Sequence, residues 1–127
     1  MTFAIEALRL IERLQPSTSA KIVANQLAKS ATSVAANYRA ACNARSRQEF
    51  VARLGVVVEE TDESSYWLEL TAKSGLHPAE QVKSLRREAG ELRAIFAKSL
   101  GTARANLNRR TVNPPIGRLK NEHTMTK

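Results

Sequence analysis

The sequence has 127 residues, of which 43% are hydrophobic and 25% are charged, a composition typical of one soluble globular domain. The net charge of +8 and the pI of about 10.3 favour polyanions as partners. Cys42 is the only cysteine, which excludes an intramolecular disulfide and fits a reducing cytoplasm, and no apolar run is long enough to predict a membrane span or a signal peptide.

The first predicted helix covers about residues 2–14, where apolar residues recur at spacings of three and four. Pro16 ends it, because proline cannot continue a helix, and Thr18 or Ser19 is expected to cap the next one. This second helix is predicted over about residues 19–43. The residues of its core arc are Val23, Leu27, Val34, Tyr38 and Ala41.

A second stripe on the same helix is small and polar, again at spacings of four, three and four. It consists of Gln26, Ser30, Ser33 and Asn37. Such a stripe is typical of a polar layer inside a helical interface, where it fixes the register at some cost in stability. We favour this structural interpretation over a direct functional role for Asn37.

The third helix is predicted from about Ser46 to Lys73. It begins with a capping box, in which Ser46 and Glu49 satisfy each other's backbone N–H groups. Tyr66 and Trp67 lie opposite its core stripe, and a helix that is apolar on two sides is usually sandwiched between neighbours. We therefore interpret these aromatic residues as part of a core or a subunit interface, in preference to a site for a planar ligand.

The fourth helix is predicted over about residues 78–104. Gly75 before it suits a left-handed C-cap, and Pro78 suits the first turn of a new helix. Its apolar seam runs through Ser99 to Ala103 with alternating spacings of three and four, as in helical bundles.

Short connections between these helices make consecutive helices antiparallel. The predicted fold is therefore an all-α, antiparallel, up-down-up-down four-helix bundle formed by residues 1–105. Residues 106–127 contain Pro-Pro and little apolar content, and they are predicted to be a flexible, basic C-terminal tail. The charged residues of this tail are Arg109, Arg110, Arg118, Lys120 and Lys127, against Glu122.

The acidic segment "EETDE" at residues 59–63 suggests metal-binding carboxylates at first. A di-iron bundle also needs Glu-x-x-His pairs, and the sequence contains none, so no metal site is predicted. Glu59 and Glu63 are four residues apart, where like charges repel on a helix. Arg39, or another base from a neighbouring helix or subunit, is the expected partner.

Basic residues dominate the region between Glu12 and Glu49, which contains no acid. The candidate residues for binding nucleic acid are Lys21, Lys29, Arg39, Arg45 and Arg47. One hypothesis is that they hold RNA or DNA, or an enzyme that acts on nucleic acid. The alternative is a structural or scaffolding oligomer whose charge only keeps it soluble.

No motif in the sequence predicts catalysis. Cys42 has no histidine near it in the sequence, and there is no Ser/His/Asp set, Walker loop or dinucleotide fingerprint. We expect no enzymatic activity and no cofactor.

Two segments between about residues 23 and 76 resemble a known family, the four-helix-bundle 23S rRNA intervening-sequence proteins. Members typically carry "ANQLxRSAxSVxANYRAA", which stands here as "ANQLAKSATSVAANYRAA", and "EFxxKLxxxxxEADExxYWLELL", which stands here as "EFVARLGVVVEETDESSYWLELT". Lys29 replaces the usual Arg, Thr61 the usual Ala, and Thr71 the usual Leu.

The resemblance implies an antiparallel bundle that assembles into a homopentameric ring, with no known enzymatic activity. A similar protein, the accessory protein of diversity-generating retroelements, associates with a reverse transcriptase and nucleic acid. The resemblance therefore makes the chain itself, nucleic acid and a nucleic-acid enzyme the expected partners.

Overall fold

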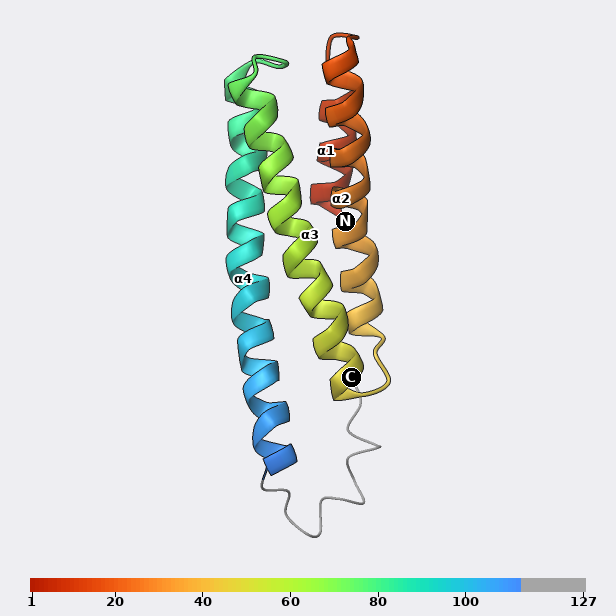
Figure 1. Ribbon diagram of the computed structural model, residues 1–127, viewed down its shortest axis with the longest axis vertical. Helices are drawn as coiled ribbons and strands as arrows, with labels where there is room; N and C mark the ends of the chain where they lie inside the picture. Colours follow the sequence, from red (N-terminus) through yellow and green to blue (C-terminus); the bar gives the residue numbers. More distant parts are fainter. Residues whose placement is uncertain (113–127) are drawn as a thin grey trace.

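Four helices form the chain in a computed structural model that describes residues 1–112. They are α1 (Thr2–Glu12), α2 (Thr18–Cys42), α3 (Arg47–Lys73) and α4 (Ala79–Val112). Their directions alternate along the chain (Figure 1). The predicted all-α, up-down-up-down four-helix bundle is thereby confirmed.

Local hydrogen bonds explain where the helices begin and end. The side chain of Ser17 caps α2 by accepting from the backbone N–H of Ala20 at 3.0 Å, so the predicted cap at Thr18 or Ser19 is one or two residues too late. Ser46 caps α3 by accepting from the N–H of Glu49 at 3.0 Å, as predicted. Gly75, with φ of 73°, ends α3, and the N–H of Leu76 donates to the carbonyl of Thr71 at 3.2 Å.

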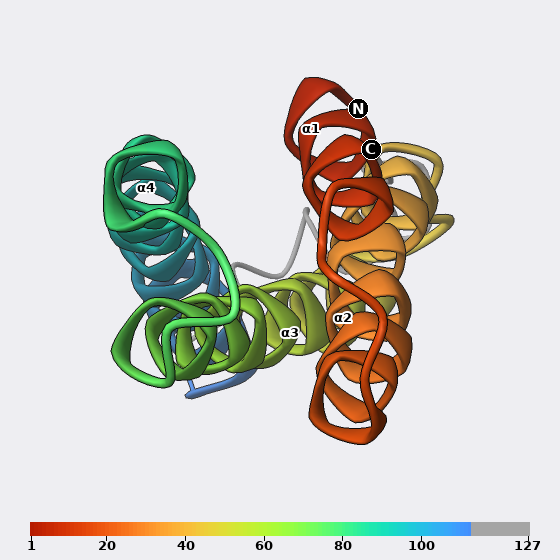
Figure 2. The same cartoon turned by 90° about the horizontal axis from the view of Figure 1, so that it is seen from above.

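α3 lies between α2 and α4 and packs against both (Figure 2). α1 also contacts α2 and α4, but its 11 residues span only about 16 Å, whereas the 25 residues of α2 span about 37 Å. α1 therefore covers one half of the bundle, and the other half is formed by three helices.

The hydrophobic core follows this division. One cluster combines all four helices and contains Phe3, Ala7, Leu10, Leu27, Ala31, Leu68, Val82, Leu85 and Ala89. The second cluster lies in the three-helix half and contains Val34, Leu54, Val57 and Leu100. Leu100 is 6% exposed, so it takes the core position that the sequence assigned to Ser99, which is exposed.

Tyr38 was predicted in the core arc of α2, and this prediction is wrong. Its side chain is 46% exposed and packs at a tilt against Phe96 of α4, with ring centroids 5.3 Å apart. The physical reason is the shortness of α1, whose N-terminus lies beside the middle of α2 (Figure 1). Without a fourth helix in that half, the ring stays at the open side of the bundle.

α4 runs to Val112, beyond the end near Arg104 that the sequence predicted. Beyond Arg104, Asn106 and Leu107 are half-buried, whereas Asn108 and Arg109 are exposed. Residues 106–112 of the predicted tail are thus helical, and the rest of it, 113–127, lies outside the described residues.

Candidate nucleic-acid and subunit interfaces

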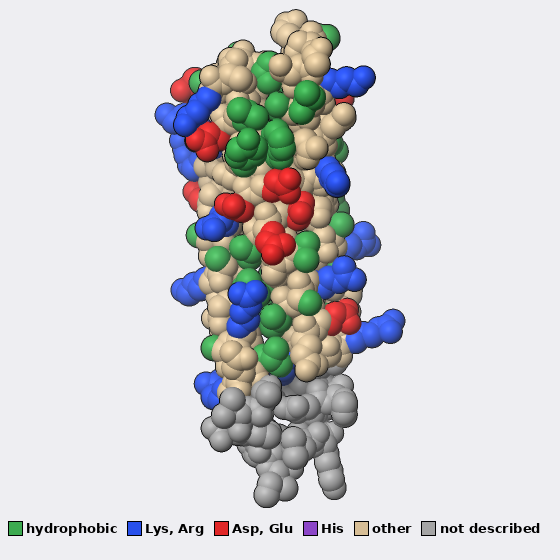
Figure 3. Space-filling view, in the orientation of Figure 1, with side chains coloured by type: hydrophobic (Ala, Val, Ile, Leu, Met, Phe, Trp, Pro, Cys, Tyr) green, Lys and Arg blue, Asp and Glu red, His purple; other side chains and the backbone are tan. Residues whose placement is uncertain are grey.

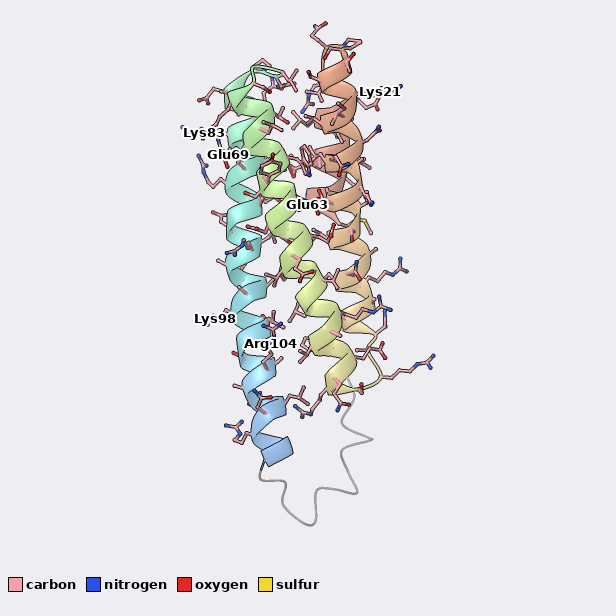
Figure 4. The ribbon with its side chains drawn as sticks, viewed as in Figure 1. Lys21, Glu63, Glu69, Lys83, Lys98 and Arg104 are labelled. Carbon is pink, nitrogen blue, oxygen red and sulfur yellow. The ribbon has the colours of Figure 1, made fainter. Side chains whose placement is uncertain are left out.

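The basic side of α2 carries three of the five predicted nucleic-acid-binding residues, Lys21, Lys29 and Arg39. All three are exposed, and α2 contains no acidic residue. Lys21 and Arg39 are five full turns apart, so they lie on the same side of the helix at a separation of about 27 Å. Lys21 points away from the bundle (Figure 4).

Lys29 lies on a different side of α2 from these two bases, and this side is closer to the acids of α3. Burial and the carboxylates of Glu63 and Glu59 raise the pKa of Glu60, and the ammonium group of Lys29 partly offsets this by lowering it. Part of the charge of Lys29 is thus compensated within the bundle. Lys21 and Arg39 form no ion pair with any of the described residues.

The remaining two predicted bases lie at the other end of α2, where the chain turns into α3. Arg45 is exposed in the connection, and Arg47 is the first residue of α3. Arg47 is half-buried, and its guanidinium Nε is enclosed without a hydrogen-bond partner in the described part of the chain. The structure therefore does not gather the five bases into one site.

The residues of the predicted polar stripe of α2 differ in burial and in their hydrogen-bond partners. Ser30 is buried and accepts a hydrogen bond of 2.9 Å from the hydroxyl of Ser64 on α3. Asn37 is half-buried and donates to the side chain of Ser33 at 3.0 Å, while Arg53 of α3 donates to its carbonyl oxygen at 3.4 Å. These residues do form a polar layer between α2 and α3.

The membership of this polar layer differs from the prediction at two residues. Gln26 is exposed and lies outside the layer. Ser64 belongs to it but was missed, although a signal existed. Counting from Val57 in steps of four and three gives Thr61, Ser64 and Leu68, all of which are buried.

The outer side of α3 presents acids followed by apolar side chains. Glu59, Glu63, Tyr66 and Leu70 recur at spacings of four, three and four, and all four are exposed; together they are called the α3 stripe. Figure 3 shows acids gathered in the middle of this face with apolar side chains beyond them, and Figure 4 shows Glu63 on the same face.

The ion pair expected between Arg39 and the acids of this stripe is not formed within one chain. Among the described residues, the two ion pairs join Lys73 to Glu69 at 2.8 Å and Arg93 to Asp62 at 2.9 Å. Glu59 and Glu63 are exposed and four residues apart, and neither forms an ion pair with a described residue, so their mutual repulsion persists. A base supplied by another subunit stays a prediction.

Trp67 lies between the core and the surface. It is half-buried, packs against the core cluster that includes Leu68, and meets the ring of Tyr66 edge-on at 4.9 Å between centroids. Its indole Nε1 is buried and has no hydrogen-bond partner among the described residues. Trp67 therefore contributes to the core, whereas Tyr66, at 55% exposure, lies on the surface.

In the part of the chain that the structure describes, no three side chains of His, Cys, Asp or Glu lie together as a metal site would require. Cys42 is exposed, and its thiol raises the pKa of the Tyr38 hydroxyl through a side-chain hydrogen bond. Among the described helices, none is long and apolar enough to cross a membrane.

Replacing Glu63 by glutamine should stabilise the protein at pH 7. The change removes one charge from a position four residues after Glu59 and three after Glu60, where each like-charge pair costs about 0.2–0.5 kcal/mol. The folded-state pKa of Glu60 is raised, so stability linked to that group is present below its unfolded pKa and is lost as pH rises through the folded value. The advantage of Glu63→Gln should therefore disappear near pH 4.

Urea unfolding of both proteins at pH 7 and pH 4 measures this effect. Asp62→Asn is the matched control, because it removes a neighbouring charge that is paired with Arg93 and should not stabilise. A loss of stability at pH 7 for Glu63→Gln would contradict the prediction. It would mean that a base from another subunit neutralises the α3 stripe.

Comparison with known proteins places this arrangement in a family. The chain is similar to a solved structure described as a protein with unknown function from the S23 ribosomal protein family of Bacteroides thetaiotaomicron, with 28% identity and a TM-score of 0.72. The similarity covers 78% of this chain and 92% of that chain. No curated protein matches the chain.

The family profile extends the resemblance seen in the second and third helices to the outer ones. Residues 1–98, well over half of the chain, match the profile described as 23S rRNA-intervening sequence protein. This stretch includes α1, α2, α3 and more than half of α4. The chain therefore belongs to the 23S rRNA-intervening sequence protein family.

Proposed function

We propose that this chain is a non-enzymatic, homo-oligomeric bundle protein that binds nucleic acid, alone or together with an enzyme acting on it, through the basic side of α2. The observation that carries the proposal is the charge of this helix. Lys21 and Arg39 are exposed on one side, form no ion pair among the described residues, and belong to a helix without acids. Cations in this state are free to neutralise phosphates.

Binding of this kind is expected to be weak for each copy of the chain. Two or three phosphate contacts give little affinity, and bases that point into solvent carry no sequence readout. An oligomer repeats the same side of α2 in each subunit, and linked contacts then add through a high effective concentration. The proposed nucleic-acid binding therefore depends on self-association.

The α3 stripe supports the proposed self-association. Tyr66 and Leu70 are 55% and 37% exposed, next to each other on one helix side, and Ile22 of α2 is 56% exposed. Exposed apolar side chains in one region are typical of protein interfaces. A homopentamer is the assembly that the family resemblance implies, and a mass of 14.0 kDa at micromolar concentration in light scattering would contradict it.

A scaffolding oligomer is the second candidate, and a specific observation favours it. Basic and acidic residues are separated on this chain, with α2 free of acids and the α3 stripe bearing Glu59 and Glu63. If α2 of one copy faces the α3 stripe of the next, opposite charges meet head to tail, and such contacts close into rings. The bases would then hold subunits together and would not bind nucleic acid.

Charge reversal at Lys21 and Arg39 separates the two candidates. Against duplex DNA, the double variant Lys21→Glu/Arg39→Glu should lose about two phosphate contacts per copy that engages the DNA. The slope of log affinity against log salt should then become shallower by about 1.8 for each such copy. The matched control is Lys83→Glu/Arg87→Glu on α4, which changes the charge equally at exposed positions.

The readouts are fluorescence anisotropy with labelled duplex at several salt concentrations and light scattering of the same samples. Loss of DNA binding with an unchanged oligomer mass supports the nucleic-acid proposal. Equal loss in both double variants would mean that net charge alone attracts DNA. Dissociation of the oligomer only for Lys21→Glu/Arg39→Glu supports the scaffold.

A further inference from the structure

A cavity of about 530 Å³ opens between the first turn of α3 and the second half of α4. This volume lies within the range of about 300–1,000 Å³ that is usual for small-molecule sites. Its lining residues are Ser46, Arg47, Phe50 and Val51 from the α3 side, and Lys98, Ser99, Thr102, Ala103 and Asn106 from α4. Among these described lining residues, two are cationic and none is acidic.

The α3 side of the cavity carries positive charge that favours an anion. Arg47 lines it with a guanidinium whose Nε is enclosed and has no partner in the described part of the chain. Nε itself is enclosed, so a ligand in the cavity would meet Arg47 through the rest of its guanidinium, which carries a full positive charge. The cavity also lies at the N-terminus of α3, where the helix dipole favours negative charge.

The α4 side adds a second cation and several neutral donors. Lys98 is exposed and forms no ion pair with the described residues (Figure 4). Thr102 and Asn106 follow it at one-turn spacings on the same helix side. The carbonyl oxygen of Asn106 accepts from Arg109, which places another guanidinium beside the lining.

The rest of the cavity is apolar. Phe50 and Val51 of α3 are half-buried and pack against the core of the three-helix half, and Ala103 faces them from α4. An inorganic anion would leave this apolar lining uncovered. An apolar molecule without charge would leave the two cations of the lining, Arg47 and Lys98, without a counter-charge.

We infer that this cavity binds a phosphate monoester attached to a flat apolar group, which is the chemistry of a nucleotide. In this proposal the phosphate is held at the cationic lining by Arg47 or Lys98, and the flat group lies against Phe50. Such a nucleotide is either free or the 5′-phosphorylated end of a nucleic acid strand. The site is separate from the proposed phosphate contacts of α2, because neither Lys21 nor Arg39 lines it.

Calorimetric titration of the full-length protein with AMP tests the inference, with adenosine and inorganic phosphate as partial ligands. AMP should bind at least about tenfold more tightly than either, because each lacks one of the two groups that the cavity contacts. Arg47→Gln/Lys98→Gln should weaken AMP binding by about tenfold or more. The matched control Arg45→Gln/Lys83→Gln removes the same charge outside the cavity and should leave AMP affinity unchanged.

Arg47 is half-buried, so its replacement could disturb folding, and a second variant tests the cavity without changing Arg47. Thr102→Glu places a carboxylate into the cavity from an exposed position of α4, and glutamate is compatible with a helix. It should abolish AMP binding, whereas the neutral Thr102→Gln should retain more of it. Circular dichroism checks that the helices of all variants are intact.

Oligonucleotides distinguish the two sources of the phosphate, a free nucleotide and the 5′-phosphorylated end of a strand. Tighter binding of a 5′-phosphorylated strand than of the same strand with a 5′-hydroxyl, with loss of this difference in Thr102→Glu, would assign the site to strand ends. Equal binding of both strands, together with AMP binding, would assign it to free nucleotides. Absence of AMP binding at millimolar concentration, or equal weakening by the control variant, would overturn the inference whatever the α2 variants do.

Discussion

Replacing Leu68 by alanine should lower the free energy of unfolding by about 2–5 kcal/mol, whereas the same change at Leu70 should cost less than about 0.5 kcal/mol. Leu68 is fully buried in the core cluster shared by all four helices, and Leu70 is 37% exposed two residues later. Truncating Leu68 removes buried methyl groups and leaves a cavity. Because domains of this size are stable by about 5–15 kcal/mol, the loss is a large share of the total.

Chemical denaturation followed by circular dichroism measures both variants at the same protein concentration. The pair is matched in chemistry and helix position, so the difference reports burial alone. Similar losses at Leu68 and Leu70 at a low protein concentration would contradict the assignment of the α3 stripe to the surface. A loss at Leu70 that grows with protein concentration would instead place this residue in a subunit contact.

Replacing Trp67 by alanine should cost about 2–4 kcal/mol. Full truncation of a buried aromatic side chain costs about 3–5 kcal/mol, and Trp67 is half-buried with one side against the core. Thermal unfolding checks the loss. An unchanged melting temperature and oligomer mass would mean that the indole is dispensable for packing, and a role in binding a planar ligand would then be favoured.

Replacing Trp67 by phenylalanine separates packing from hydrogen bonding. The indole Nε1 is buried without a partner among the described residues, and an unsatisfied buried donor costs about 1–3 kcal/mol. Phenylalanine removes this cost while it loses some apolar volume, so the stability should stay within about 1 kcal/mol of the original. Dissociation of the oligomer by Trp67→Phe would contradict this reasoning, because it would show that Nε1 donates to another subunit.

The candidate sites were predicted from sequence only where local pattern was sufficient. Ser30 was assigned to a polar layer from its spacing on α2, and it is buried against Ser64 of α3. Ser64 was missed, although it lies on the buried side of α3 that runs from Val57 through Thr61 to Leu68 at helical spacing. Arg47 was grouped with other bases by charge alone. That it lines one cavity with Lys98 depends on two helices meeting, which no spacing within one helix can predict.

By itself, the sequence determined the number, order and direction of the helices, because Pro16, Gly75 and the cap at Ser46 act through their own backbone and nearest neighbours. Only the tertiary structure decided which apolar side chains are covered. Tyr38 is exposed because α1 is too short to cover it, and Leu100 of α4 is buried where the sequence pattern had placed Ser99. Burial is set by contacts between distant segments, whereas the helices and most of their ends are set by local chemistry, because caps and turns act within a few residues.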